Sequence, residues 1–226
     1  MSPNLSGALL MTASMASFVL NDTFLKLTGG VIPLFQLIFL RGVLSMALVL
    51  LLAHSMGALR FNITPRDRSI IVMRGVTEVA IAYFFLNALF NMPLGNLNAI
   101  MQVVPLTVTL ATALIFREAV GWRRMLAILI GFFGVMLIIR PGAEGFNIWS
   151  LYALAAVFCV TIRDLITRRL SPDVPGMTVT AGTTAAVLIA AGLASTTSEW
   201  VAISALNTLY ISASAVVILG GYYFSI

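Results

Sequence analysis

The 226-residue sequence contains one cysteine, one histidine and one lysine, and only 9% of its residues are charged. Soluble domains carry about 25% charged residues, so the low charge content excludes a water-soluble core-and-surface protein. The single cysteine, Cys159, cannot form an internal disulfide or a metal cluster. The single histidine, His54, lies at a predicted helix end, and no lysine follows Lys26. The last point excludes a retinal protein with a Schiff base in a late helix.

Long apolar runs fill most of the chain. Hydrophobic residues make up 60% of it, and the mean hydropathy is +1.04. Because a helix needs about 20 apolar residues to cross a bilayer, the runs predict an all-α integral membrane protein with about eight spans. The predicted spans are 5–27, 33–53, 69–90, 95–116, 125–139, 148–166, 177–194 and 203–226.

The basic residues lie mainly in the short connections between spans. Although the sequence pI is about 10, Arg-rich short loops are an orientation signal and not a nucleic-acid surface. With a cytoplasmic N-terminus, Lys26 and Arg140 fall outside, Arg41 lies within a span, and the other ten basic residues fall inside. Those ten are Arg60, Arg66, Arg68, Arg74, Arg117, Arg123, Arg124, Arg163, Arg168 and Arg169. The pattern predicts a multi-pass protein of the cytoplasmic (inner) membrane with its N-terminus in the cytoplasm.

Two charged residues, Arg41 and Glu78, lie deep in consecutive apolar runs. A charge at the centre of a membrane helix costs about 2.5–3.5 kcal/mol on insertion scales, and such residues usually face a partner or an aqueous path. We expect both to line a central cavity and to contribute to binding or proton coupling. The alternative is an Arg–Glu pair that only locks two helices together.

Polar residues also form stripes along several spans. In the fourth, a stripe falls on one helical face, and Pro105 within it is expected to break or bend the helix. Such a stripe faces a cavity or serves as hydrogen-bonding contact between helices, and both interpretations stay open. The first span has a similar face, the third carries Tyr83 and Asn87, and several glycines are expected to be close-packing points. The fourth-span stripe is Asn98, Gln102, Pro105, Thr109 and Thr112, the first-span face is Ser14, Ser17, Asn21 and Thr28, and the glycines are Gly131, Gly134, Gly182 and Gly192.

An internal repeat relates the two parts of the chain. With an offset of 142 residues, residues 21–26 align with residues 163–168, so that Asp22 matches Asp164, and Pro33 aligns with Pro175. With an offset of 139, residues 82–85 align with 221–224. The copies begin five spans apart, an odd number, so the second copy is predicted to be inverted in the membrane. Inverted repeats are typical of secondary transporters. We therefore predict repeats at 1–142 and 143–226.

The same alignment leaves the counterparts of residues 88–141 without a match, which predicts a ten-helix protein truncated after its eighth helix. Without a ninth and a tenth helix, Thr183, Ser212 and Ser214 would be exposed to lipid.

The order of these motifs resembles the EamA family of the drug/metabolite transporter superfamily. The residues that carry the resemblance are 21–26, Arg41-Gly42, 99–106, Arg117-Glu118 and 131–142. The resemblance implies ten helices in two inverted five-helix repeats around a central cavity, and transport of metabolites or drugs by alternating access. The end of the first span resembles the bacterial branch that includes riboflavin and S-adenosylmethionine carriers.

We expect the substrate or coupling site to use Arg41, Glu78, Asn21, Asp22, Tyr83, Asn87, Asn98 and Gln102. The predicted function is transport of a small polar metabolite, riboflavin or a related nucleoside-like compound. The alternatives are an S-adenosylmethionine, amino-acid or drug carrier, or a non-transporting membrane subunit. Expected partners are the substrate and the lipid bilayer but no nucleic acid, a homodimer stays open, and no cofactor or metal is expected. An enzyme is disfavoured because His-Glu-x-x-His and Gly-x-Ser-x-Gly motifs are absent from the sequence.

Overall fold

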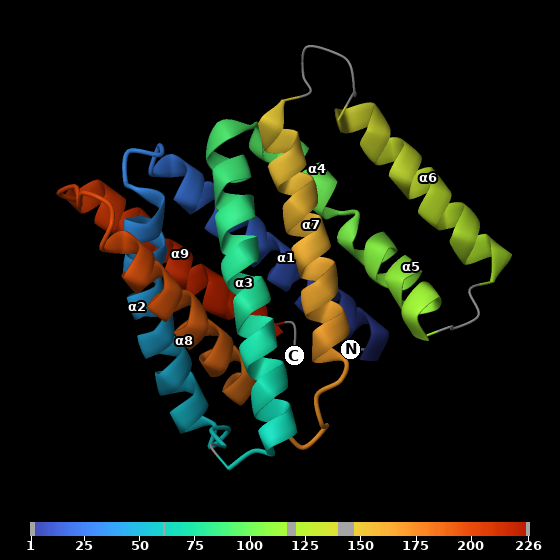
Figure 1. Cartoon of the computed structure of the whole chain (residues 1–226), viewed down its shortest axis with the longest axis horizontal. Helices are drawn as coiled ribbons and strands as arrows, with labels where there is room; N and C mark the ends of the chain where they lie inside the picture. The colour runs from blue at the N-terminus through green and yellow to red at the C-terminus, as the bar shows by residue number, and fades with distance from the viewer. Residues whose placement is uncertain (1–2, 61, 117–120, 140–146, 225–226) are drawn as a thin grey trace. The chain divides into compact units, whose positions relative to one another are not determined.

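The computed structural model describes residues 3–60, 62–116, 121–139 and 147–224, and these residues contain nine helices (Figure 1). The helices are α1 (Pro3–Leu27), α2 (Leu34–Ser55), α3 (Pro65–Asn91), α4 (Leu94–Met101), α5 (Val104–Phe116), α6 (Trp122–Ile139), α7 (Ile148–Thr167), α8 (Gly176–Ser195) and α9 (Ala205–Phe224).

Each of the eight predicted spans is helical, and the fourth consists of α4 and α5 together. Within the described residues, five segments are long and apolar enough to cross a membrane, and Ala205–Gly221 is a shorter apolar helix. The five are Leu34–Ser55, Pro65–Asn91, Leu94–Ile115, Ile148–Thr167 and Gly176–Ser195. The all-helical prediction is therefore confirmed, whereas the full set of eight crossings stays a prediction.

Local sequence signals set several helix ends. At the start of α3, Thr64 accepts a hydrogen bond from the backbone N–H of Asp67, and Pro65 occupies the first helical position. At the start of α7, the Asn147 side chain accepts from the backbone N–H groups of Trp149 and Ser150. These caps satisfy backbone donors that the helices themselves leave unpaired.

The fourth span is broken, as the sequence predicted. The α4 helix ends at Met101, Gln102 and Val103 form a turn, and α5 begins at Val104. Proline has no backbone N–H, so Pro105 cannot donate to the carbonyl of Met101 four residues earlier. The chain instead continues through a bond from the Leu106 N–H to the Val103 carbonyl at 2.9 Å.

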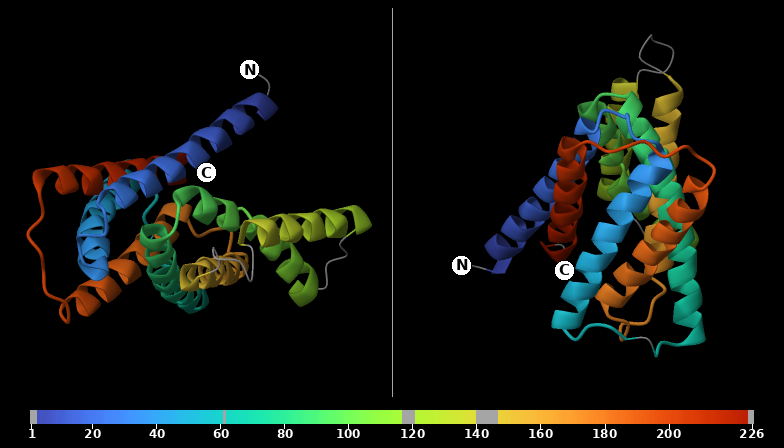
Figure 2. Two further views of the ribbon diagram at one scale, coloured as in Figure 1. Left: turned by 90° about the horizontal axis from the view of Figure 1, so that it is seen from above. Right: turned by 90° about the vertical axis from the view of Figure 1, so that its left-hand side faces the viewer.

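The chain divides into two compact units, and the first comprises Met1–Asn62 and Pro175–Ile226. Within it α1 packs along α9, and α2 packs along α8 and α9 (Figure 2). Glycines permit close approach: a Cβ at Gly42 would lie 3.2 Å from Leu188, and one at Gly192 would lie 3.2 Å from Phe39. Gly192 was predicted as such a packing point.

Buried polar groups in this unit correct one prediction. Thr183 and Ser214 are 5% and 0% exposed, and Ser212 is half-buried, so the first two are not exposed to lipid. The Thr183 hydroxyl donates to backbone carbonyls of its own helix, including that of Val179, and Ser214 donates to the Ile211 carbonyl. The Thr183 and Ser214 hydroxyls are therefore buried within the protein and hydrogen-bonded to carbonyls of their own helices. The expectation of lipid exposure did not consider this burial.

The second unit is Ile63–Val174, with α3 beside α7, and α4 and α5 also packed on α7 (Figure 1). The Thr107 and Thr161 hydroxyls share a hydrogen bond of 2.7 Å between α5 and α7. A Cβ at Gly131 of α6 would lie 2.1 Å from Leu106, whereas one at Gly134 would meet no atom within 4 Å. The close-packing prediction is therefore confirmed at Gly131 and wrong at Gly134.

Each unit contains helices from both predicted repeats, since the first combines α1 and α2 with α8 and α9. The predicted repeat boundary after residue 142 thus does not coincide with the division into units. Repeats in sequence can be interleaved in space, so the repeats stay a prediction.

Candidate functional site

Glu78 of α3 forms an ion pair with Arg163 of α7, with 3.5 Å between Oε2 and Nη1. Arg163 also pairs with its neighbour Asp164 at 2.8 Å from Nη2 to Oδ1. The side chains of Glu78 and Arg163 are about one-fifth exposed. Glu78 is therefore paired with Arg163, which the sequence analysis had counted only among the ten basic residues on the cytoplasmic side.

Arg41 of α2 acts electrostatically on Asp22 of α1. Asp22 is 8% exposed, and the Nδ2 group of Asn21, itself 4% exposed, donates to its Oδ1 at 3.0 Å. The Oδ1 atom of Asn21 is buried and has no hydrogen-bond partner among the described residues. Asn21 and Asp22 of α1 therefore form a buried polar cluster, on which the half-buried Arg41 of α2 acts through its charge.

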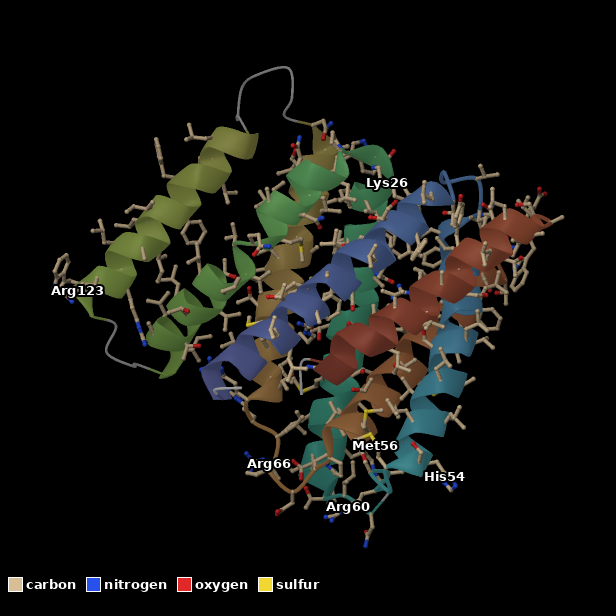
Figure 3. The ribbon with its side chains drawn as sticks, turned by 180° about the vertical axis from the view of Figure 1, so that it is seen from behind. Lys26, His54, Met56, Arg60, Arg66 and Arg123 are labelled. Carbon is tan, nitrogen blue, oxygen red and sulfur yellow. The ribbon has the colours of Figure 1, made fainter. Side chains whose placement is uncertain are left out.

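The Asp22 and Arg41 positions lie at similar depths along their helices. Asp22 precedes the end of α1 by five residues, and Arg41 follows the start of α2 by seven, which corresponds to about 8 and 10 Å. The connecting turn uses Gly29 and Gly30 in the left-handed region, with φ of 68° and 67°. Lys26, at this end of α1, lies at the opposite end of its unit from His54, Met56 and Arg60 (Figure 3).

Polar bonds continue along the contact between α3 and α7. Arg74 donates to the Thr167 hydroxyl one helical turn from the Glu78–Arg163 pair, and the Ser171 backbone N–H donates to Asp67 at 3.1 Å. A polar contact between membrane helices avoids lipid and adds stability of about 0.6–2 kcal/mol for each hydrogen bond.

Four aromatic side chains, here called the aromatic group, meet near the end of α3 and the start of α7. Tyr152 lies 6.1 Å from Tyr83, 5.5 Å from Phe84 and 5.4 Å from Trp149 between ring centroids. Tyr83 is 37% exposed, so part of the aromatic group is open at the surface of its unit. Asn87 is nearby in sequence, and its Nδ2 group donates to the Tyr83 carbonyl.

Gln102, predicted as the central residue of the fourth-span stripe, lies at the helix break and is exposed. Pro105 is also exposed, Asn98 and Thr109 are half-buried, and Thr112 is 4% exposed. Gln102 follows the start of α4 by eight residues and Tyr83 precedes the end of α3 by eight, about 12 Å in each case. Both therefore lie at similar depths on either side of the short connection at Met92 and Pro93.

On the first span, the predicted polar face turns toward protein. Ser14, Asn21 and Thr28 are each less than 5% exposed, and the Ser14 hydroxyl donates to the Gly221 carbonyl of α9 at 2.8 Å. This face therefore holds α1 against α9 at Ser14 and reaches the buried cluster at Asn21.

Sequence reasoning missed the functional candidates on α7. Arg163 was read only as an orientation signal, although its alignment with Asn21 in the repeat marked it as a candidate. Trp149 and Tyr152 gave a weaker signal, three residues apart on one helical face. The family motif residues Arg117, Glu118, Arg140, Pro141 and Gly142 lie outside the described residues.

Three curated relatives resemble parts of the chain. A riboflavin transporter of Vibrio cholerae is 35% identical over 82 residues, which cover 36% of this chain and 28% of that protein. S-adenosylmethionine uptake transporters of Rickettsia prowazekii and Rickettsia bellii are 22% and 24% identical over 166 and 157 residues. Those matches cover 73% and 69% of this chain, and 55% and 53% of the relatives. The chain thus spans about half or less of the length of these relatives. No solved structure is significantly similar to it.

A model of the EamA-like transporter family matches residues 5–140, which is more than half of the chain. The members of this family are transporters and not enzymes, and the apolar helices described above agree with a multi-pass membrane protein. On this match, the chain belongs to the EamA-like transporter family.

Proposed function

We propose that this protein moves a small polar metabolite with a flat aromatic ring, such as riboflavin or a related nucleoside-like compound, across the cytoplasmic membrane. The observation that carries the proposal is the break at Gln102 within a predominantly apolar span, where the amide is exposed. Interrupted helices in transporters present polar groups to substrates near the bilayer midplane. The Gln102 amide both donates and accepts hydrogen bonds, which suits a neutral heterocycle.

The aromatic group supports the choice of a ring-bearing substrate. Tyr83 and Gln102 belong to the same unit and lie at similar depths, and Tyr83 is the most exposed member of the aromatic group. Offset stacking between aromatic rings contributes about 0.5–1.5 kcal/mol beyond the area that it buries. We assign Tyr83, Asn87, Asn98 and Gln102 to substrate contact, and Arg41, Glu78, Asn21 and Asp22 to binding or coupling.

The helix pairing supports alternating access through inverted repeats. Under the repeat offset, α1 corresponds to α7, α2 to α8 and α3 to α9. The α1–α9 contact then corresponds to α7–α3, and the α2–α8 contact corresponds to itself, which is the pattern that a two-fold relation between repeats requires. With the N-terminus in the cytoplasm, the aromatic group lies toward the outer end of its helices.

S-adenosylmethionine is the second candidate substrate. The two relatives named for its uptake match 73% and 69% of this chain, whereas the riboflavin transporter matches 36%. S-adenosylmethionine carries an adenine ring and a sulfonium cation. The ring would use the same aromatic group, and the cation would favour contact with Glu78.

The first test is uptake of radiolabelled riboflavin by the full chain reconstituted in lipid vesicles. We expect saturable uptake, competition by unlabelled riboflavin, and a loss of about tenfold or more in the Gln102→Ala variant, corresponding to 1.4 kcal/mol. Asn62→Ala, an exposed amide outside the helices, is the matched control and should transport like the parent. Competition by S-adenosylmethionine but not riboflavin would select the second candidate. Uptake equal to that of empty vesicles for both compounds would overturn the proposed function.

The single cysteine permits a direct test of where Gln102 points. After Cys159→Ser, a cysteine at position 102 should react with a membrane-impermeant thiol reagent and should be protected by riboflavin. A cysteine at Leu110, on the other side of the same span, is the matched comparison and should react more slowly. Faster labelling at Leu110 would mean that the polar stripe does not face the aqueous path.

A further inference from the structure

We propose that Asp22 is the residue that takes up and releases a proton during transport, with Asn21 as its hydrogen-bond partner in both protonation states and Arg41 as its counter-charge when ionised. This inference rests on the proposed transport function, and it names the coupling ion and the residue that carries it.

Asp22 is distinguished from the other described acidic residues of the apolar segments by being buried with a single hydrogen-bond donor. It is 8% exposed, whereas the side chains of Glu78 and Asp164 are 20% and 33% exposed and share the cation Arg163. Asp67, in the first turn of α3, is 1% exposed but accepts from both the Thr64 hydroxyl and the Ser171 backbone N–H. Burying a carboxylate in a low-dielectric region disfavours its ionised form unless charges or donors compensate. Asp22 has one such donor, the Asn21 amide, and one such charge, Arg41.

The Asn21 side chain is complementary to the protonated form of Asp22. In the structure its Nδ2 group donates to Asp22 Oδ1, while its own Oδ1 is buried without a hydrogen-bond partner among the described residues. A carboxylate has no hydrogen to offer that acceptor, but a protonated carboxyl group has an O–H donor. Protonation of Asp22 would allow the two neighbouring side chains to form a paired amide–carboxyl arrangement. The Oδ1 atom of Asn21 would then accept a hydrogen bond from the O–H group of the protonated Asp22.

Arg41 stabilises the ionised form of Asp22, as Asn21 stabilises the protonated form. When Asp22 is ionised, the guanidinium group neutralises it electrostatically. When Asp22 is protonated, this electrostatic attraction between α1 and α2 is lost. The protonation state of Asp22 thereby changes the electrostatic attraction between α1 and α2, the two helices that the Gly29–Gly30 turn connects.

Few other ionisable groups face Asp22 from the elements around it. On α1 itself Lys26 lies one turn away, and the α2 group is Arg41. On α9, which packs along α1, the described ionisable side chain is Tyr210, whose ring stacks on Phe24 at 6.3 Å between centroids. In each transport cycle a proton from the water on one side of the membrane binds the Asp22 carboxylate. The same proton leaves to the water on the other side, so that one proton crosses the membrane in each cycle.

The first experiment needs no substrate. Infrared difference spectra of the full chain in lipid, recorded between acidic and alkaline pH, contain a C=O stretch for every carboxyl group that titrates in that range. One component of this signal should be lost in Asp22→Asn and kept in Asp173→Asn, a control in an exposed loop. In Asn21→Ala it should shift to higher frequency because the carbonyl loses an N–H donor. In Arg41→Gln it should persist at pH values where the parent has lost it. Retention of this component in Asp22→Asn, or its absence from the parent at every pH, would overturn the proposal.

The second experiment uses vesicles and radiolabelled riboflavin. The parent and Asp173→Asn should accumulate several-fold more riboflavin with an imposed pH gradient than without one, whereas Asp22→Asn should show no difference. Asp22→Glu should recover the gradient dependence, which separates a proton-carrying role from a failure to fold. Gradient dependence that survives in Asp22→Asn would overturn the proposal. If no variant transports riboflavin, the proposed substrate fails, while the infrared result still decides the role of Asp22.

Discussion

Arg163 donates from Nε to the Oδ1 of its neighbour Asp164 at 2.9 Å, and Asn21 donates from Nδ2 to the Oδ1 of Asp22 at 3.0 Å. The two pairs occupy equivalent positions in the predicted repeats, so the same contact between consecutive residues occurs in α7 and in α1. The chemistry differs, because Arg163 brings its own positive charge and also binds Glu78, whereas Asn21 is neutral. Asp22 therefore depends on a cation from another helix, Arg41.

The first prediction concerns Arg163. Arg163→Gln removes the cation that serves both Glu78 and Asp164, while Glu78→Gln leaves Arg163 paired with Asp164. We expect Arg163→Gln to lower the stability by about 1–3 kcal/mol and Glu78→Gln to lower it less, since uncompensated charges in partly buried sites are costly. Thermal unfolding in detergent measures both. Equal losses would show that the Asp164 contact contributes nothing.

A second prediction follows from Gln36, which is 1% exposed in α2. Its amide donates to the Val201 carbonyl at 2.8 Å and accepts from the Val201 N–H at 3.0 Å. It thus ties the segment before α9 to α2. Gln36→Leu removes both hydrogen bonds to Val201, a residue that is itself 43% exposed, and should cost about 1–2 kcal/mol. It should also raise the rate of amide hydrogen exchange at Val201. The exposed Gln102→Leu is the matched control for stability, and an equal loss there would contradict the prediction.

The sequence allowed much of the fold to be predicted, because membrane helices are marked by length and hydropathy alone. The eight apolar segments are helical within a few residues of the predicted ends, and Pro105 correctly indicated the break. The removal of one backbone donor by proline is a local effect that needs no knowledge of neighbouring helices.

Which helices pack together was not predictable from the same signals. Glu78 was considered as a partner of Arg41 because the two lie on consecutive helices, and its ion pair with Arg163 of α7 was not anticipated. An ion pair depends on the packing of α3 against α7, and hydropathy carries no information on that. Gly131 and Gly134 are the same residue type in similar sequence surroundings, but only Gly131 faces Leu106.

That pair of glycines supplies a third prediction. Replacing a glycine by alanine within a helix favours folding by about 0.5–1 kcal/mol when the added methyl group has room. Gly134→Ala should therefore stabilise the protein. Gly131→Ala should be neutral or destabilising, because its Cβ would lie 2.1 Å from Leu106 Cδ1 and that side chain must move. Comparing the two melting temperatures checks this. A larger gain at position 131 than at position 134 would contradict the packing of α6 on α5.

The last prediction concerns the break in the fourth span. Pro105→Ala restores a backbone N–H that can reach the Met101 carbonyl, so α4 and α5 should become continuous through Gln102. Because a regular helix satisfies its own backbone groups in a membrane, the variant should be as stable as the parent or more so. Its riboflavin uptake should nonetheless fall about tenfold or more, since the exposed turn that presents Gln102 would be lost. Pro93→Ala, in the connection before α4, is the matched proline control and should leave uptake near the parent level. Parallel measurement of unfolding and uptake decides the matter: unchanged uptake in Pro105→Ala would mean that the break has no part in transport.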